Sequence, residues 1–558
     1  MTNKEISAQF STLAKLMDIH GENSNKAKSY TNAAFAIGKL PFEIEEAGIE
    51  ALEGQFGIGQ SIVSNVLLIM DGEEIPELSA LLKTTPAGIL ELLKIRGIGP
   101  KKIGQLWKEL DIQGPEDLLK ACQANQLISL KGFATKTQSA IEEKVEFYFE
   151  NKGTLLWSQA EQIMPSIEKM LSELCKERKY KILGDFYWQN ETVSSFTVLI
   201  STKDSTSPDE QLDFLPKDDW EFLNLREGKW FHYKFKNSLS FQFIVVPEVD
   251  FEKQKFLQSF SEEIQAELDL SGISKFDEEQ QVFSELGIEF MPPYIRNSFS
   301  AFEKAQTGLP KIIDLADIKG VIHNHSQWSD GVHTIAEMAQ ACINRGYEYF
   351  VLSDHSKTSS YAGGLSEERI IEQQKEIDAL NQKLKPFRIF KSIECDILGD
   401  GSLDYEDAVL ASFDVVICSV HQNLSMKEDK AMSRLLAAIE NPYTSILGHM
   451  TGRLLTSRQG YPLDHKKIID ACAANEVAIE LNANPRRLDM DWRWIEYAMK
   501  KDVLISINPD AHQTEGIDDI RYGVLVAQKG LLSPTMNVSS FSLDEFEEWL
   551  MTQHQKRQ

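Results

Sequence analysis

Metal-binding side chains recur at the ends of short apolar runs in the C-terminal part of the chain, and this pattern restricts the fold. Six of the eleven histidines follow or end such runs, together with three acids. In chain order they are His323, His325, Asp330, His355, Glu394, His421, His449, Asp510 and His512. Imidazole and carboxylate are ligands of Zn, Mn and Fe. One tetrahedral ion cannot use them all, so the sequence predicts a cluster of two or three metals, the arrangement that hydrolyses phosphate esters.

The apolar runs themselves predict buried parallel strands. Examples are residues 349–352, which precede His355, and residues 503–507, which precede Asp510. They are short and largely apolar on both faces, as in strands that are covered on both sides. Helical stretches such as 334–344 separate them. Alternating strands and helices indicate a parallel α/β barrel or sheet, and the ligands then gather at the C-terminal strand ends, where barrel enzymes place their chemistry.

Glycine turns ahead of predicted helices indicate a platform for nucleic acid near the N-terminus. Gly57-Ile58-Gly59 and Gly97-Ile98-Gly99 have this form, and Leu130-Lys131-Gly132-Phe133 is a weaker third copy. Such turns expose backbone N–H groups at a helix N-terminus, which suits a phosphate oxygen. The second turn leads into Lys101 and Lys102. We therefore expect DNA to be bound through its backbone, without sequence readout, although ordinary packing turns have the same appearance.

Composition is that of a large multidomain globular protein. The chain has 558 residues, 42% of them hydrophobic, which exceeds what a single core organises. It has no apolar run of membrane-spanning length, no signal-peptide core, and six cysteines without a Cys-x-x-Cys pair, so we expect a reduced cytoplasmic protein. The net charge of −27 is unusual for a DNA-binding protein and predicts weak, strongly salt-dependent binding.

The C-terminal motifs resemble the PHP (polymerase and histidinol phosphatase) domain. The matching strings are His323-Asn-His325, Ser-Asp-His355-Ser, Glu394-Cys-Asp, Ser-Val-His421, Gly-His449-Met-Thr-Gly-Arg453 and Asn-Pro-Asp510-Ala-His512. The resemblance implies a distorted seven-stranded barrel with a trinuclear site. It implies that the first metal is held by His323, His325, Glu394 and Asp510, the second by Glu394, His421 and His449, and the third by Asp330, His355 and His512.

For the chemistry, this resemblance implies metal-assisted hydrolysis of a phosphate ester. Glu394 would bridge two metals, Asp510 would serve as a ligand, and Arg453 would stabilise charge that develops on the phosphate. Arg458 is a further candidate for a phosphate contact. Mn or Zn is expected first, with Fe or Co as alternatives, because such sites accept each of them.

The order of segments resembles a bacterial family X DNA polymerase with a C-terminal PHP domain. The string Asn482-Ala-Asn484-Pro-Arg486-Arg487-Leu-Asp489 matches the version of the PHP domain found in that family. The resemblance implies four domains along the chain. They are an N-terminal helix-hairpin-helix domain (1–88), a second, fingers-like one (89–150), a degenerate palm and thumb (151–315) and the PHP phosphoesterase domain (316–558).

The predicted palm lacks the carboxylates that its family uses for nucleotidyl transfer. Ser195 and Thr197 stand where the Asp-x-Asp pair is expected, and Gln242 stands at the third aspartate. Hydroxyls and an amide bind Mg²⁺ poorly, because this ion needs hard anionic oxygens. Ser61 and Asn65 likewise replace the lysines of the family's lyase activity. We therefore predict that the palm fold persists while polymerase activity is lost.

The predicted function is a DNA-binding, metal-dependent phosphoesterase, either a 3′–5′ exonuclease or a 3′-end-processing enzyme of DNA repair. Three alternatives stay open. One is a PHP phosphatase for a small molecule, whose ligand set is nearly the same. Another is a non-catalytic DNA-binding scaffold that keeps metals for stability. The last is a family X polymerase with residual activity through another carboxylate, such as Asp185.

Overall fold

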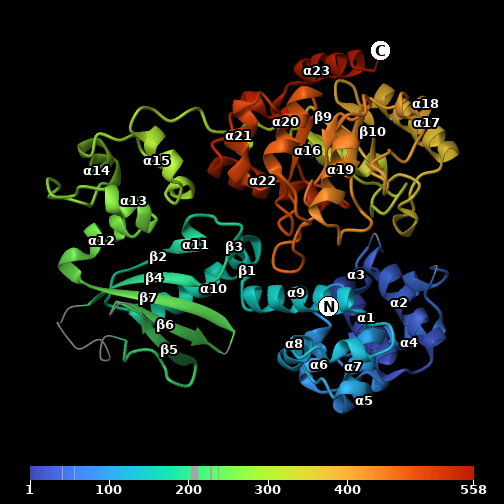
Figure 1. Cartoon of the computed structure of the whole chain (residues 1–558), viewed down its shortest axis with the longest axis horizontal. Helices are drawn as coiled ribbons and strands as arrows, with labels where there is room; N and C mark the ends of the chain where they lie inside the picture. The colour runs from blue at the N-terminus through green and yellow to red at the C-terminus, as the bar shows by residue number, and fades with distance from the viewer. Residues whose placement is uncertain (41, 56, 203–211, 227–228, 237, 558) are drawn as a thin grey trace. The chain divides into compact units, whose positions relative to one another are not determined.

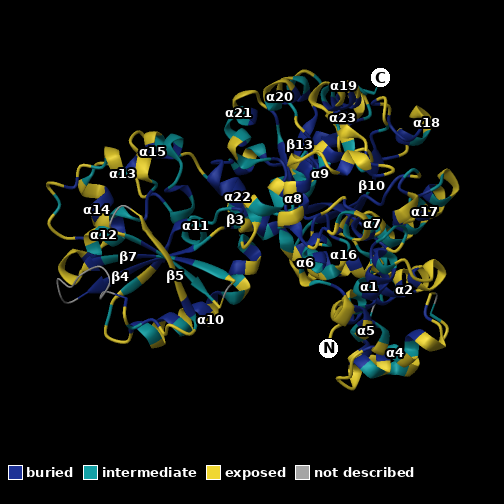
Figure 2. Ribbon diagram, turned by 60° about the horizontal axis from the view of Figure 1, so that its bottom comes forward, coloured by how far each residue is buried: buried dark blue, intermediate teal, exposed yellow. Residues whose placement is uncertain are grey.

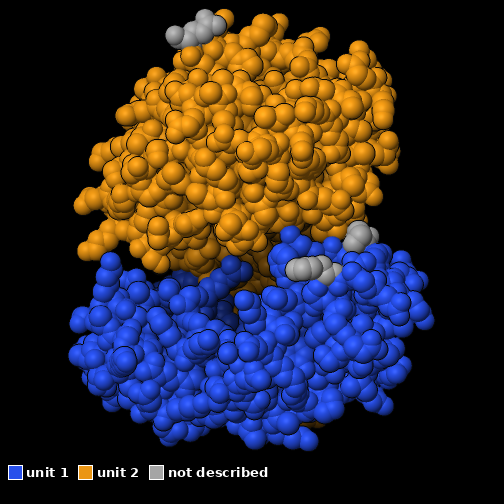
Figure 3. Space-filling model, turned by 90° about the vertical axis from the view of Figure 1, so that its right-hand side faces the viewer, with its two compact units in different colours: residues 1–152 blue, residues 153–558 orange. Residues whose placement is uncertain are grey.

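The computed structural model describes residues 1–40, 42–55, 57–202, 212–226, 229–236 and 238–557. Contacts divide the chain into two compact units, Met1–Lys152 and Gly153–Gln558, which Figure 3 colours separately. All six cysteines are buried and free, as predicted. Within the described residues, no helix has the length and apolar character needed to cross a membrane.

The first unit is helical and has one continuous apolar core. Its helices are α1 (Asn3–His20), α2 (Ser24–Gly38), α3 (Ile44–Ala47), α4 (Gln60–Met70), α5 (Pro76–Thr84), α6 (Ala87–Leu92), α7 (Pro100–Leu110), α8 (Pro115–Gln123) and α9 (Thr135–Asn151). The sequence sets several helix starts: Thr2 and Glu5 form a capping box at α1, and Pro100 occupies the first turn of α7. Buried residues from Ile6 to Val145 join in the core.

The second unit begins with a mixed sheet and a group of short helices. The sheet has the order β2-β4-β7-β6-β5, and only the β4–β7 pair is parallel. The strands are β2 (Tyr180–Leu183), β4 (Phe196–Thr202), β5 (Trp220–Arg226), β6 (Trp230–Phe235) and β7 (Leu239–Pro247), and β1 (Leu155–Leu156) pairs with β3 (Thr192–Val193). The helices are α10 (Trp157–Cys175), α11 (Gly184–Tyr187), α12 (Phe251–Leu257), α13 (Glu262–Glu267), α14 (Glu279–Glu285) and α15 (Phe299–Ala305). Each of the two parts has its own apolar core, and each core contains several phenylalanines.

A seven-stranded parallel sheet follows, in the order β14-β13-β12-β11-β10-β9-β8. Its strands are β8 (Gly320–Asn324), β9 (Tyr349–Leu352), β10 (Arg388–Asp396), β11 (Val415–Ser419), β12 (Ile446–Leu447), β13 (Ala478–Asn482) and β14 (Ile505–Asn508). The two edge strands approach each other, because Asn324 bridges Ala511 and the His325 N–H donates to the Ala511 carbonyl at 2.8 Å. The nearly closed parallel barrel confirms the predicted fold class.

Helices surround these strands, as Figure 1 shows. They are α16 (Ile335–Asn344), α17 (Glu367–Lys383), α18 (Asp407–Leu410), α19 (Glu428–Ile439), α20 (His465–Ala474), α21 (Ile495–Lys500), α22 (Ile520–Lys529) and α23 (Leu543–Gln555). The barrel strands are buried on both faces, which explains their continuous apolar sequence (Figure 2). The division into four domains at residues 88, 150 and 315 stays a prediction.

Candidate metal centre

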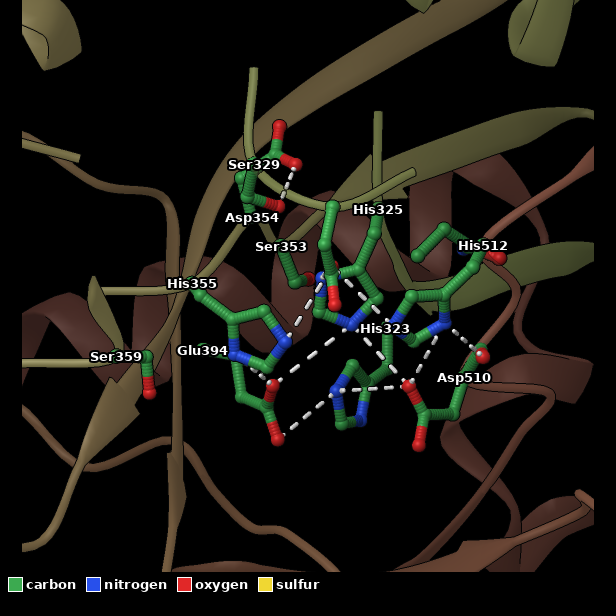
Figure 4. A network of polar contacts seen from close by, with 12 residues as sticks. His323, His325, Ser329, Ser353, Asp354, His355, Ser359, Glu394, Asp510 and His512 are labelled. Carbon is green, nitrogen blue, oxygen red and sulfur yellow. Dashed lines mark hydrogen bonds and ion pairs between the residues drawn. The ribbon is translucent and has the colours of Figure 1, made fainter. Parts of the chain in front are cut away.

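The nine predicted ligands converge at the C-terminal ends of the barrel strands. Parallel strands place their carboxyl ends at one edge, so side chains that are far apart in the sequence meet there. His323 is the second-last residue of β8, Glu394 lies on β10, and the other ligands lie on the segments that follow the strands. Figure 4 shows Glu394 between His355 and His323, with His325, Asp510 and His512 on the other side of the cluster.

Glu394 is the centre of the cluster. Its Oε1 lies 2.9 Å from His449 Nε2, 3.1 Å from His421 Nε2 and 3.3 Å from His323 Nε2. Its Oε2 lies 2.9 Å from His355 Nδ1. One buried carboxylate therefore faces four imidazoles, a geometry suited to an oxygen shared between metal ions.

Asp510 and Asp330 complete the other half of the cluster. Asp510 Oδ1 lies 3.1 Å from His325 Nε2, and Asp330 Oδ1 lies 3.3 Å from His512 Nε2. The ring centroids of His325 and His512 are 4.2 Å apart. Imidazoles thus flank both carboxylates, as in sites for two or more divalent ions.

Three groups of these side chains have the spacing of a metal site. They are His323, His325 and Asp510; His355, Glu394 and His421; and His325, Asp330, His355 and His512. These groups overlap with the sets implied by the PHP domain but differ in three ways: His325 and His355 each take part in two groups, Glu394 is absent from the group of His323, and His449 is in none of them. Several buried ligand atoms make no hydrogen bond within the described residues: His323 Nε2, His325 Nδ1, His355 Nδ1, Glu394 Oε2 and His449 Nδ1. A buried polar atom is costly unless something binds it, so the residues present fit divalent metals.

The histidines of the cluster differ in the direction in which their surroundings shift the pKa. Burial, together with the neighbouring His512 and His355, lowers the pKa of His325 to about 3, which keeps it neutral as a ligand must be. Burial also disfavours protonation of His512, but the hydrogen bond to Asp330 and the charge of Asp510 prevail and raise its pKa to about 9. For Glu394, burial is outweighed by the charges of the nearby histidines, which hold the pKa of this carboxyl well below its usual range.

Two buried carboxylates that the sequence analysis missed orient the ligands. Glu480 Oε2 lies 2.5 Å from His323 Nδ1, and its Oε1 accepts the His449 backbone N–H at 3.1 Å. Asp396 Oδ1 lies 2.5 Å from His421 Nδ1. A carboxylate on the second ring nitrogen fixes the tautomer and makes the imidazole a better ligand. The available signal was a charged residue inside an apolar strand, Glu480 in Ala-Ile-Glu-Leu-Asn.

A third missed residue, Asp354, supports the loop that carries Asp330. Its carboxylate accepts hydrogen bonds from the Ser326 N–H at 2.8 Å, Ser329 Oγ at 2.5 Å and Gln373 Nε2 at 2.6 Å. Figure 4 shows Asp354 bonded to Ser329 beside the cluster. Asp354 therefore holds two chain segments together at the rim of the metal centre.

Three arginines near the site differ in what they contact. Arg453 donates to the carbonyl of Arg487 at 3.1 Å, to the carbonyl of Leu488 and to Asp491 at 3.1 Å, so its guanidinium is engaged in holding a loop. Arg487, which the sequence analysis did not single out, has its Nε 3.5 Å from Asp510 Oδ2. Arg458 donates to the Gly452 carbonyl at 2.9 Å. Arg487 is therefore the arginine that contacts a predicted ligand.

Two of the three substituted palm positions, Thr197 and Gln242, lie side by side on neighbouring strands. Thr197 and Gln242 are paired in the parallel register of β4 and β7, and Thr197 Oγ1 donates to Gln242 Oε1 at 3.4 Å. Ser195 directly precedes β4 and lies two residues from Thr197, on the same side of the chain. Asp185 is engaged elsewhere, because it accepts from Ser194 N and Oγ at 3.1 and 2.8 Å.

The glycine turns of the first unit have the backbone that the sequence predicts. Gly57, Gly97 and Gly132 have φ of +83°, +84° and +89°, in the left-handed region that favours glycine. Gly59 and Gly99 are the N-caps of α4 and α7 and add no side chain over the helix start. Lys101 and Lys102 follow on α7 and are exposed. Two helix N-termini are thus free of capping side chains.

Comparisons with known proteins support both the glycine turns of the first unit and the barrel with its cluster of histidines and acids. Residues 1–74 match a helix-hairpin-helix domain, and residues 322–484 match the PHP domain. The chain is 32% identical to "DNA polymerase/3'-5' exonuclease PolX" of Bacillus subtilis (strain 168), over 99% of each protein. It is also 29% identical to a "Probable phosphatase" of Syntrophotalea carbinolica, over 29% of this chain and 64% of that protein.

Proposed function

This chain belongs to the bacterial family X DNA polymerases with a C-terminal PHP domain, and from that premise we propose that it trims DNA 3′ ends and no longer polymerises. The reaction proposed is hydrolysis of the terminal phosphodiester, in a 3′–5′ exonuclease or a 3′-end-processing enzyme of DNA repair. The observation that carries the proposal is the convergence of six histidines and two aspartates around Glu394.

The barrel residues supply the requirements of such a reaction. His323, His325, Asp330, His355, Glu394, His421, His449, Asp510 and His512 would hold two or three divalent ions, with Mn or Zn expected first. Such ions supply Lewis acidity to a phosphoryl oxygen and to the attacking water. Glu480 and Asp396 keep His323 and His421 in one orientation. Asp510 holds the Arg487 guanidinium at the edge of the cluster.

We assign the phosphate contact to Arg487 and a supporting role to Arg453. A planar guanidinium suits phosphate oxygens, and that of Arg487 lies beside a predicted metal ligand. Arg487→Ala is expected to lower kcat/KM for a phosphodiester by about 100-fold, the usual effect of removing one preorganised contact to developing charge. Steady-state kinetics on a short duplex measure this. The matched control is Arg486→Ala, because Arg486 is the exposed neighbour in the same loop; equal losses in both variants would contradict the assignment.

Loss of polymerase activity is the second part of the proposal. The paired Thr197 and Gln242 offer no carboxylate to a catalytic ion, and Asp185 is held in a local turn. The test is one gel with the full chain, an end-labelled duplex with a recessed 3′ end, Mn²⁺ and all four dNTPs. We expect a shortened ladder, without extension, that disappears in His325→Ala. An extended primer would show that the palm is still active.

The same gel, together with an assay of phosphate release from small monoesters, distinguishes the remaining alternatives. An unchanged primer together with release of phosphate from small monoesters would favour the small-molecule phosphatase. No reaction on either substrate, with a lower melting temperature in His325→Ala, would favour the scaffold.

The exposed helix starts at Gly59 and Gly99, with Lys101 and Lys102, support DNA as the partner, bound through its backbone. The proposed location is the cytoplasm.

A further inference from the structure

Within the second unit, the degenerate palm packs against the loop that carries Arg487. Glu191 and Asn190 of the palm line one small cavity together with Pro485 and Leu488 of the loop between β13 and α21, residues 483–494. The cavity measures about 10 Å³, which leaves room for no more than one water. The two surfaces are therefore in close contact at this point.

A series of charged side chains crosses this contact. Glu191, whose side chain is only 10% exposed, accepts from Arg493 Nη1 at 3.0 Å. The same nitrogen donates to the two carboxylate oxygens of Asp491 at 2.9 and 3.0 Å. Asp491 also accepts from Arg453 Nη1 at 3.1 Å. The four residues alternate in charge, so each one holds the next in position.

The series ends at the backbone of Arg487. Arg453 Nε donates to the Arg487 carbonyl at 3.1 Å, and Arg453 Nη2 donates to the Leu488 carbonyl. The Arg487 side chain in turn reaches Asp510 at 3.5 Å. A continuous line of contacts therefore joins Glu191 of the palm to a residue that borders the metal centre.

The palm end of this series is fixed by the barrel and the short helices. Lys529 of α22 is buried and donates to the carbonyls of Trp188 and Tyr294 at 2.9 and 3.2 Å and to Asn297 Oδ1 at 3.0 Å. Asn297 Nδ2 donates to Asn190 Oδ1 at 2.9 Å. The segment that carries Glu191 is thus anchored on both sides.

We propose that the palm is retained as a positioning element for the metal centre and acts through Glu191 on Arg487. This inference rests on the proposed phosphoesterase function. A phosphate contact must be held to a fraction of an ångström, and side chains around it supply that rigidity. Without the Glu191 carboxylate, Arg493 loses its anchor on the palm, and the Asp491–Arg453 pair can shift together with the backbone of Arg487. Glu191 is a positioning residue, because it does not reach the cluster itself.

The test compares two variants that each remove one palm carboxylate from the same interface. Glu191→Gln breaks the series, whereas Glu161→Gln changes the contacts of Glu161 with two residues of α22, Arg521 at 3.0 and 2.5 Å and the Tyr522 hydroxyl at 3.1 Å. With the full chain, Mn²⁺ and bis(4-nitrophenyl) phosphate, Glu191→Gln is expected to lower kcat about tenfold, a coupling of ordinary size. It should also weaken binding of inorganic phosphate, measured by calorimetry, to a similar degree and leave Mn²⁺ affinity unchanged. Glu161→Gln should match the wild type in all three measurements.

A double-mutant cycle decides whether Glu191 acts through Arg487. In an Arg487→Ala background, Glu191→Gln should cause no further loss of kcat or of phosphate affinity, because its target is gone. If Glu191→Gln folds poorly, Glu191→Asp withdraws the carboxylate from Arg493 while keeping its charge. Equal losses in Glu191→Gln and Glu161→Gln, or additive losses in the cycle, would overturn the proposal. If the wild type hydrolyses no phosphate ester, the proposed function fails, and the phosphate-binding cycle still decides the coupling.

Discussion

Glu394→Gln is expected to abolish hydrolysis, with a loss of about 1,000-fold or more. Glu394 faces His323, His355, His421 and His449 at 2.9–3.3 Å, so it is the residue on which the whole cluster depends. An amide keeps the size but presents an NH₂ group and no charge, so metal-dependent stabilisation worth several kcal/mol is lost. The measurement is the rate of 3′-end shortening with Mn²⁺, together with the bound metal content.

The control is a glutamine substitution at an ordinary acid of the barrel. Glu440 is the exposed C-cap residue of α19 and belongs to none of the three groups with the spacing of a metal site. Glu440→Gln should retain wild-type rate and metal content. If Glu394→Gln retained the wild-type rate, the reaction would have to take place elsewhere in the protein, and the assignment of the barrel as the active centre would be wrong.

Removal of the metals is expected to lower the melting temperature of the second unit by about 10 °C. A ligand present at 1,000 times its dissociation constant stabilises the fold by about 4 kcal/mol. The barrel, from β8 to α23, has the size of a domain that shifts by roughly 2–4 °C per kcal/mol. Without metals, the buried ligand atoms at His323, His325, Glu394 and His449 remain without hydrogen bonds. Scanning calorimetry with EDTA, and again after Mn²⁺ is added back, measures the shift.

The control for the effect of EDTA is the Glu394→Gln variant. Glu394→Gln should show a smaller change on chelation, because its metal content is already reduced, and melting of the first unit should not respond. A wild-type melting temperature that is unaffected by EDTA would mean that the cluster stays folded without ions, and the trinuclear site would lose its support.

The chelated protein should also become less stable as the pH rises. The pKa of His512 is raised from 6.5 to about 9 by Asp330 and Asp510, against the effect of burial. Its protonated form therefore stabilises the metal-free fold fully below about pH 6.5, and this contribution is lost as the pH rises through about 9. Melting curves of the EDTA-treated protein at pH 6.5 and pH 9 measure the difference. A higher melting temperature at pH 9 would contradict this sign.

The sequence by itself determined the barrel and brought its candidate ligands to one edge. Apolar runs such as 349–352 are covered on both faces and predict parallel strands, and residues directly after such strands must meet at one edge. His355 and Asp510 could therefore be placed in one cluster before any coordinates were known. The resemblance to the family X polymerases assigned Thr197 and Gln242 to the positions of the missing carboxylates, and the structure pairs these two residues in the parallel register of β4 and β7.

Only the tertiary structure decided which side chains support that cluster. Glu480 and Asp396 are acids inside strands, and their role depends on which histidine nitrogen each one faces. The sequence favoured Arg453 as the phosphate contact, but the fold uses its guanidinium to hold the backbone of Arg487. The hydrophobic periodicity of a sequence indicates which face of a helix or strand is buried. The direction of a long polar side chain depends on partners up to hundreds of residues away, such as Glu191 with Arg493, and these come together only when the elements pack.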